Sequence, residues 1–249
     1  MAKCKRSAAR ALDWLAAEAD VVAVVASEPD PFTSEEQRVD LVAERHGLPL
    51  ASAEEIQHEP PEDVDLVVSF LFWQRIREPL LSAGRAGCLN FHPAPLPDMR
   101  GLGGYNVAVL EGMSEWGVSC HFVDRELDTG DLVEVERFPI DPDTATAFSL
   151  DLDSQQRLLG LFQRVMRRAL DGEELPRTPQ GEGRYVGREE FESLRRVRPG
   201  DDLDRKLRAF WYPPHPGAVI EVDGRELTLV DEGLLADAAK AYRDSGQVP

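Results

Sequence analysis

Asn90, His92 and Asp128 are the residues of this chain whose types and placement best suit chemistry. Each stands at the end of an apolar run and is followed by a turn rich in glycine or proline. Strands of α/β proteins deliver polar side chains to a crevice in this way. An amide N–H can donate to a developing oxyanion, an imidazole can donate to it or move a proton, and a carboxylate can orient both groups and hold a water. The three together predict an acid–base site with an oxyanion donor.

The spacing of these residues resembles that of a known family. The pattern Asn-x-His-Pro-x-x-Leu-Pro-x-x-Arg-Gly begins at Asn90, and an Asp-Thr-Gly follows at Asp128. This order is similar to that of the folate-dependent formyltransferases, which include glycinamide ribonucleotide, methionyl-tRNA and amino-sugar N-formyltransferases. The resemblance runs from about Val64 to Ile140. It implies that Asn90, His92 and Asp128 are the catalytic residues and that 10-formyltetrahydrofolate is the formyl donor, with no metal required.

The resemblance also implies a mechanism. A neutral amine attacks the formyl carbon, and Asn90 and His92 stabilise the oxyanion of a tetrahedral intermediate, each such donor contributing about 3 to 4 kcal/mol. Asp128 holds the charge state of the imidazole and an ordered water. The ammonium formed on the attacking amine must lose a proton while N10 of the folate gains one as it leaves, and whether His92 or that water carries the proton stays open.

Further contacts follow from the resemblance alone. In relatives the pteridine lies against the backbone of two segments, which implies folate contacts at Phe72, Gln74, Ile76, Val123, Asp124 and Asp128. The turn after the motif implies acceptor contacts at Arg100, Gly104 and Tyr105.

Each catalytic candidate has a structural alternative when taken alone. Asn90 could satisfy the backbone groups of a turn, His92 could be a surface residue before its proline, and Asp128 could be a loop carboxylate. The family spacing favours the functional interpretation for all three. His121, in the middle of a predicted strand, is interpreted as structural.

The charge balance bears on the partners. The chain of 249 residues carries 46 acidic and 28 basic side chains, for a net charge of -18. A tRNA-binding enzyme needs a basic face to neutralise phosphates, and this sequence has no long basic run. Nucleic acid is therefore not expected as a substrate.

Neither a membrane span nor a disulfide framework is expected. The longest apolar stretch, from Leu66 to Trp73, is far too short to cross a bilayer, and the first ten residues do not resemble a signal peptide. The 3 cysteines include no Cys-x-x-Cys pair, which favours a reducing, cytoplasmic location. One alternative would combine Cys120, His121 and His92 in a zinc site.

Alternating strand and helix patterns predict an α/β fold with a Rossmann-like, doubly wound and mostly parallel sheet. Strand patterns cover 21–26, 65–72, 87–91, 117–123 and 132–138, and helical patterns cover 8–19, 33–46, 105–110 and 154–170. Residues 1–172 are expected to form the catalytic domain, and 173–249 a linker and a small β-rich subdomain. Within the latter, Asp223-Gly224 between two apolar runs is a strong hairpin signal.

The N-terminus departs from the family pattern. Relatives usually begin with a strand and a loop of small residues, whereas here a helical pattern begins at about Ala8. Either the first strand is reduced to a stub or the chain begins at an internal start.

The acceptor expected from the resemblance is a nucleotide-linked amino sugar. The sequence Asn-Phe-His-Pro-Ala-Pro-Leu-Pro from Asn90, the chain length, the small C-terminal tail and the acidic charge agree with the amino-sugar formyltransferases. The alternatives are a formyltransferase for another small amine, a formyl-folate hydrolase and a non-catalytic folate-binding module. The family also implies that a homodimer could form through the tail.

Overall fold

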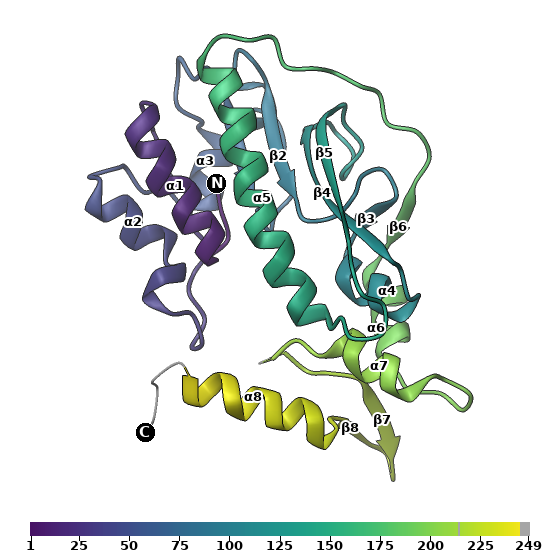
Figure 1. The fold of residues 1–249 in the computed structure, drawn as a ribbon. Coiled ribbons are helices and arrows are strands. Elements are labelled where there is room, and N and C mark those ends of the chain that lie inside the picture. The colour runs from purple at the N-terminus through teal and green to yellow at the C-terminus, as the bar shows by residue number, and fades with distance from the viewer. Residues whose placement is uncertain (214, 245–249) are drawn as a thin grey trace. The chain divides into compact units, whose positions relative to one another are not determined.

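The computed structural model describes residues 1–213 and 215–244 (Figure 1). The chain folds into two compact units. Unit 1 comprises Met1–Gly101, Trp116–Phe138 and Asp153–Tyr185. Unit 2 comprises Leu102–Glu115, Pro139–Leu152 and the residues from Val186 onwards. The long helix α5 (Ala147–Leu170) contributes to both units. The domain boundary expected near residue 172 stays a prediction, and residues 214 and 245–249 of the expected C-terminal subdomain lie outside the described residues.

A four-stranded sheet organises unit 1. Its strands lie in the order β1 (Val67–Phe70), β2 (Cys88–His92), β4 (Glu115–Phe122) and β5 (Leu132–Pro139). β1 and β2 are parallel, whereas β2 and β4 are antiparallel. Every residue of β4 after the first is buried, as expected of a strand covered on both faces. The Rossmann-like α/β class predicted from the sequence is confirmed, with a mixed sheet.

One face of this sheet is covered by α5 together with α1 (Arg6–Glu18), which lie side by side in Figure 1. Phe162 of α5 packs on Phe70 and Phe91, with ring centroids 5.6 and 4.9 Å away, and its edge meets Trp14 of α1 at 5.9 Å. Because side chains alternate along a strand, the neighbours of Phe70 and Phe91 point to the opposite face. That face carries the polar residues of interest.

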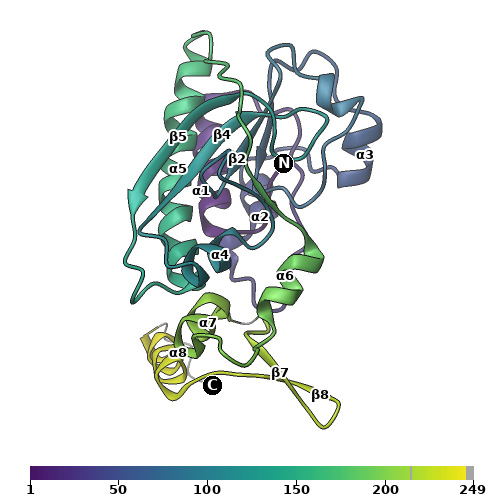
Figure 2. The same cartoon turned by 90° about the vertical axis from the view of Figure 1, so that its right-hand side faces the viewer.

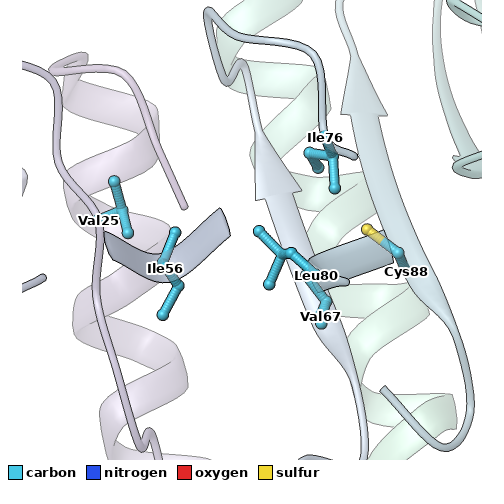
Figure 3. Packing of buried hydrophobic residues seen from close by; sticks show 6 residues of the cluster. All are labelled: Val25, Ile56, Val67, Ile76, Leu80 and Cys88. Carbon is cyan, nitrogen blue, oxygen red and sulfur yellow. The ribbon is translucent and has the colours of Figure 1, made fainter. Parts of the chain in front are cut away.

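An apolar cluster occupies part of the opposite face. It gathers residues of β1, β2 and their connections, namely Val25, Ile56, Val67, Ile76, Leu80 and Cys88. Figure 3 shows these side chains around the two strands, with α1 and α5 behind them. The helix α3 (Ala53–His58) supplies Ile56, and the short 3-10 helix η2 (Leu80–Ser82) supplies Leu80. Burial raises the pKa of the Cys88 thiol to about 12, so this cysteine behaves as an apolar core residue.

The N-terminus forms a strand stub. Ala2 makes isolated parallel bridges to Ala26 and to Phe70. The strand predicted over 21–26 is reduced to single bridges at Val24 and Ala26, because a continuous ladder needs a neighbour that pairs at successive residues.

Two predicted helices have different limits in the structure. The helix expected over 33–46 is divided at Arg38 into a 3-10 helix η1 (Glu35–Gln37), with its predicted capping box, and α2 (Val39–Arg45). The helix expected from Ser154 starts at Ala147, because Thr146 and Ser149 exchange side-chain hydrogen bonds with each other's backbone N–H groups.

Unit 2 is built from short elements: α4 (Gly104–Leu110), α6 (Arg188–Arg195), α7 (Leu203–Phe210), β7 (Val219–Val222), β8 (Arg225–Thr228) and α8 (Glu232–Asp244). α4 packs against α7, and the Asn106 amide donates to the carbonyl of Ala209. The predicted hairpin is confirmed by the antiparallel pair β7–β8, visible in Figure 2. Its turn residues Asp223 and Gly224 have φ angles of 50° and 73°, the left-handed values that such a two-residue turn requires.

The segment 173–183 of unit 1 has little regular structure, as its glycines and prolines predict. Thr178 nevertheless exchanges two backbone hydrogen bonds with Leu132 at the start of β5. Further along, β6 (Arg184–Val186) pairs with the short strand β3 (Met99–Gly101). None of the helices in the described part of the chain is long and apolar enough to span a bilayer.

Candidate active site

Asn90 lies in a row of three hydrogen-bonded side chains across the sheet. The strand register places it opposite Ser69 of β1 on one side and His121 of β4 on the other. The Ser69 hydroxyl donates to Asn90 Oδ1 at 2.7 Å, and Asn90 Nδ2 lies 3.0 Å from His121 Nε2. Because both ends of the carboxamide are held, its orientation is fixed, with the nitrogen towards His121.

His121 is kept neutral, and one tautomer fits its contacts. Its Nδ1 lies 2.7 Å from the carbonyl of Phe122, which can only accept, so Nδ1 carries the proton. The lone pair on Nε2 then accepts from Asn90. Burial, with a smaller effect from the neighbouring His92, lowers the pKa of His121 to about 4, although the Asp128 carboxylate acts in the opposite sense.

His92 and Asp128 meet on the same face. Asp128 Oδ1 lies 3.7 Å from His92 Nδ1 and 3.8 Å from His121 Nε2, so one carboxylate oxygen is nearly equidistant from the two imidazoles. Both distances exceed a direct hydrogen bond, so the carboxylate acts on the two rings only through its own charge. Asp128 is buried, with 8% of its surface exposed, so this charge is only weakly screened by solvent.

The loop between β4 and β5 is folded so that it returns Asp128 to the sheet. Asp128 has a φ angle of 58°, a left-handed conformation unusual for a residue with a side chain. The Gly101 N–H donates to Asp128 Oδ2 at 3.2 Å. Asp124 Oδ1 accepts from the Thr129 hydroxyl at 2.7 Å, which closes the loop on itself.

The residues predicted to contact folate lie in two segments that meet at the apolar cluster. Ile76 is a buried member of it, and Phe72 and Val123 pack against it. The Gln74 side chain is exposed, whereas Asp124 is partly buried in the hydrogen bond just described. Contact of these residues with folate stays a prediction.

The residues predicted to contact the acceptor are divided between the units. Arg100 belongs to unit 1, where its Nη2 donates to Gln180 Oε1 and to the Gly181 carbonyl, both at 3.0 Å. Gly104 and Tyr105 belong to unit 2, where they form the start of α4. An acceptor contact at these positions stays a prediction.

Two residues of the site were not expected from the sequence. The sequence predicts no role for Ser69 and a structural one for His121, and the structure shows that both bind the Asn90 side chain directly. The alternation of side chains along a strand shows which face of its own strand Ser69 or His121 lies on. Only the pairing register between strands shows that both stand opposite Asn90.

The alternative zinc site does not fit this geometry. Cys120 and His121 are consecutive residues of β4, so their side chains point to opposite faces of the sheet. Among the described residues, no group of three or more potential ligands is placed to hold a metal ion.

Comparison with known proteins identifies the class. Residues 3–158, more than half of the chain, match the formyl transferase family. The chain belongs to this family, as its motif predicts. Its sequence identity to the individual members compared below is about one third or less.

A GDP-perosamine N-formyltransferase of Brucella melitensis is 32% identical over 66% of this chain and 63% of its own length. The chain thus spans less than two thirds of that relative. A methionyl-tRNA formyltransferase of Sorangium cellulosum is 30% identical over 96% of this chain and 78% of its own length. Among solved structures, an N-formyltransferase of Helicobacter canadensis, in complex with folinic acid and dTDP-3-aminofucose, has a similar fold. It matches with a TM-score of 0.73 at 18% identity, covering 90% of this chain and 83% of that one.

Proposed function

We propose that this protein transfers a formyl group from 10-formyltetrahydrofolate to the amino group of a nucleotide-linked amino sugar. The observation that carries the proposal is the fixed carboxamide of Asn90 on the same sheet face as His92 and Asp128. A donor whose direction is set before the reaction stabilises a developing oxyanion without reorganising during it.

Asn90 has the donor that such a reaction needs. One of its two N–H bonds points to His121 Nε2, and the second makes no hydrogen bond among the described residues. That second N–H serves the formyl oxygen, on which negative charge develops as the amine attacks. His92, whose Nδ1 faces Asp128, presents its Nε2 side for donation to the same oxygen or for proton movement. When the tetrahedral intermediate collapses, the C–N10 bond breaks, N10 gains a proton and the new ammonium loses one, with the Asp128 carboxylate holding the His92 ring beside this exchange.

The described residues also suit the donor. The donor carries its formyl group on N10 and has a partly reduced pteridine ring that needs apolar contact and backbone hydrogen bonds. The segments containing Phe72 and Val123 meet at one apolar cluster. The rings of Phe72 and Trp73 lie 4.5 Å apart, and Trp73 is 43% exposed. We infer that these segments bind the ring system.

The acceptor is inferred from charge and from the relatives. The Brucella relative is a GDP-perosamine N-formyltransferase, and the Helicobacter structure holds dTDP-3-aminofucose. The Sorangium relative is named as a methionyl-tRNA formyltransferase. A net charge of -18 opposes binding of a polyanion such as tRNA and favours a small acceptor.

The proposal is tested by a transfer assay that follows tetrahydrofolate release from 10-formyltetrahydrofolate. The acceptors are a panel of nucleotide-linked 3-amino and 4-amino sugars, with methionyl-tRNA included. We expect turnover that depends on one amino sugar and that collapses in His92→Asn, while folate binding survives. The control is His46→Asn, which changes an exposed histidine paired with Asp13 and should leave turnover unchanged.

The other outcomes have distinct meanings. Release without an acceptor would identify a formyl-folate hydrolase. Folate binding without any turnover, equal in wild type and His92→Asn, would identify a non-catalytic binding module. Turnover with methionyl-tRNA alone would overturn the acceptor assignment and keep the family chemistry.

A further inference from the structure

Gln180, in the irregular segment 173–183, uses all the hydrogen-bonding groups of its side-chain amide in one place. Its Nε2 donates to the carbonyl of Asp128 at 3.2 Å and to the carbonyl of Gly130 at 2.7 Å. Its Oε1 accepts from Arg100 Nη2 at 3.0 Å. A side-chain amide offers two N–H donors and one oxygen, so this arrangement joins three separate parts of unit 1.

These contacts hold the backbone on both sides of Thr129 in the loop between β4 and β5. Asp128 has a left-handed φ angle of 58°, which an unsupported chain visits rarely. Its carboxylate is held separately, by the Gly101 N–H at 3.2 Å. Arg100 and Gly101 are consecutive residues of the short strand β3. The Asp128 carboxylate is bound directly to Gly101, and the Asp128 backbone is connected to Arg100 through Gln180.

We propose that Gln180 is a positioning residue for the reaction, setting the place of the Asp128 carboxylate relative to His92. The inference rests on the proposed function. Without the clamp made by Gln180, the peptide after Asp128 is free to rotate away from its left-handed conformation. The carboxylate then moves, because its direction depends on that backbone. The separation of 3.7 Å between Asp128 and His92 would no longer be maintained.

Two substitutions of Gln180 distinguish the effect of its hydrogen bonds from the effect of its side-chain volume. Gln180→Met keeps the length of the side chain and removes all three hydrogen bonds. Gln180→Glu keeps the shape and the oxygen that accepts from Arg100, but its second carboxylate oxygen faces two carbonyl oxygens, which repel it. A protonated glutamic acid can donate again, so the deficit of Gln180→Glu relative to wild type should shrink as the pH falls. The deficit of Gln180→Met should not change with pH.

We expect kcat to fall about tenfold in both variants at neutral pH, on the order expected for losing the hydrogen bonds of one partly buried side chain. The matched control is Glu182→Gln, an exposed residue of the same segment, which should keep wild-type kcat. Wild-type kcat in Gln180→Met would overturn the proposal.

A second measurement does not depend on turnover. Amide hydrogen exchange of the peptide covering 125–131 should be faster in Gln180→Met than in Glu182→Gln, with other regions unchanged. Equal exchange in the two variants would refute the clamp itself. If wild type transfers no formyl group to any acceptor, the proposed function fails, and the exchange experiment alone decides whether Gln180 orders the loop.

Discussion

Asn90 Nδ2 and His121 Nε2 lie 3.0 Å apart on neighbouring antiparallel strands. The contact requires a neutral imidazole, because the protonated ring would turn a second N–H towards the amide nitrogen. The low pKa of His121, about 4, therefore preserves the orientation of the proposed oxyanion donor. His121 takes no part in the proposed proton transfer, but it orients the side chain that is proposed to stabilise the oxyanion.

Replacing His121 by phenylalanine tests this relation. The aromatic ring fills the same space but cannot accept from Asn90, so the carboxamide loses one of its two anchors. We expect kcat to fall about tenfold, close to 1.4 kcal/mol, as for one lost buried hydrogen bond. Steady-state kinetics check the value, and His46→Asn serves as the control. Wild-type kcat in the variant would show that Ser69 alone orients Asn90.

The stability of the protein should depend on His121 at acid pH. The folded-state pKa of His121 is depressed to about 4 from the ordinary value of 6.5, so the unfolded chain binds this proton first as the pH falls. The contribution to the free energy of unfolding is complete above pH 6.5 and is lost towards pH 4. A shift of this size corresponds to on the order of 3 kcal/mol.

Urea unfolding of wild type and His121→Phe across that pH range measures the effect. The difference between the two proteins isolates His121 from the carboxylates, which titrate in both. We expect the stability of wild type to fall more steeply than that of the variant. Parallel curves would contradict a depressed pKa at this position.

Ser69→Ala should weaken the other anchor of Asn90. The substitution leaves Asn90 Oδ1 without the hydroxyl that lies 2.7 Å away. We expect the free energy of unfolding to fall by about 1 to 2 kcal/mol and kcat to fall severalfold. Ser69→Thr keeps the hydroxyl and should recover most of the loss in kcat, which a purely steric role for Ser69 would not predict.

Asn90→Ala removes the proposed oxyanion donor itself. We expect kcat to fall roughly 10²- to 10³-fold, with a much smaller change in the dissociation constant for folate. Single-turnover kinetics and folate titration together check this. A variant that loses folate binding and transfer in equal measure would place Asn90 in the binding of the donor instead.

Gly130 is expected to be irreplaceable in the loop between β4 and β5. A Cβ atom there would lie 2.0 Å from the carbonyl oxygen of Phe122, closer than any real contact, so the loop would have to shift. Gly130→Ala should therefore reduce both activity and thermal stability. Gly160→Ala provides the contrast, because Gly160 is within α5 and its nearest neighbour, at 3.6 Å, is a flexible arginine side chain. That variant should gain about 0.5 to 1 kcal/mol.

The sequence by itself determined the α/β class, the family and the β7–β8 hairpin, because these depend on local patterns. The strand patterns over 87–91, 117–123 and 132–138 predicted β2, β4 and β5 close to their observed limits, and Asp223-Gly224 predicted the hairpin turn. The pattern over 21–26 predicted a strand equally well, but its neighbour Ala2 pairs at one residue only. Pairing depends on a partner distant in sequence, which a local pattern does not contain.

Only the tertiary structure decided how the site residues are oriented. Asn90 and His92 are neighbours in the motif, but Ser69 and His121 reach Asn90 through strand register, and Gln180 reaches Asp128 across a long stretch of chain. Register and loop docking are set by the summed packing of the whole unit. The side chains that the motif names are therefore readable from sequence, whereas the groups that hold them in place become visible only after folding.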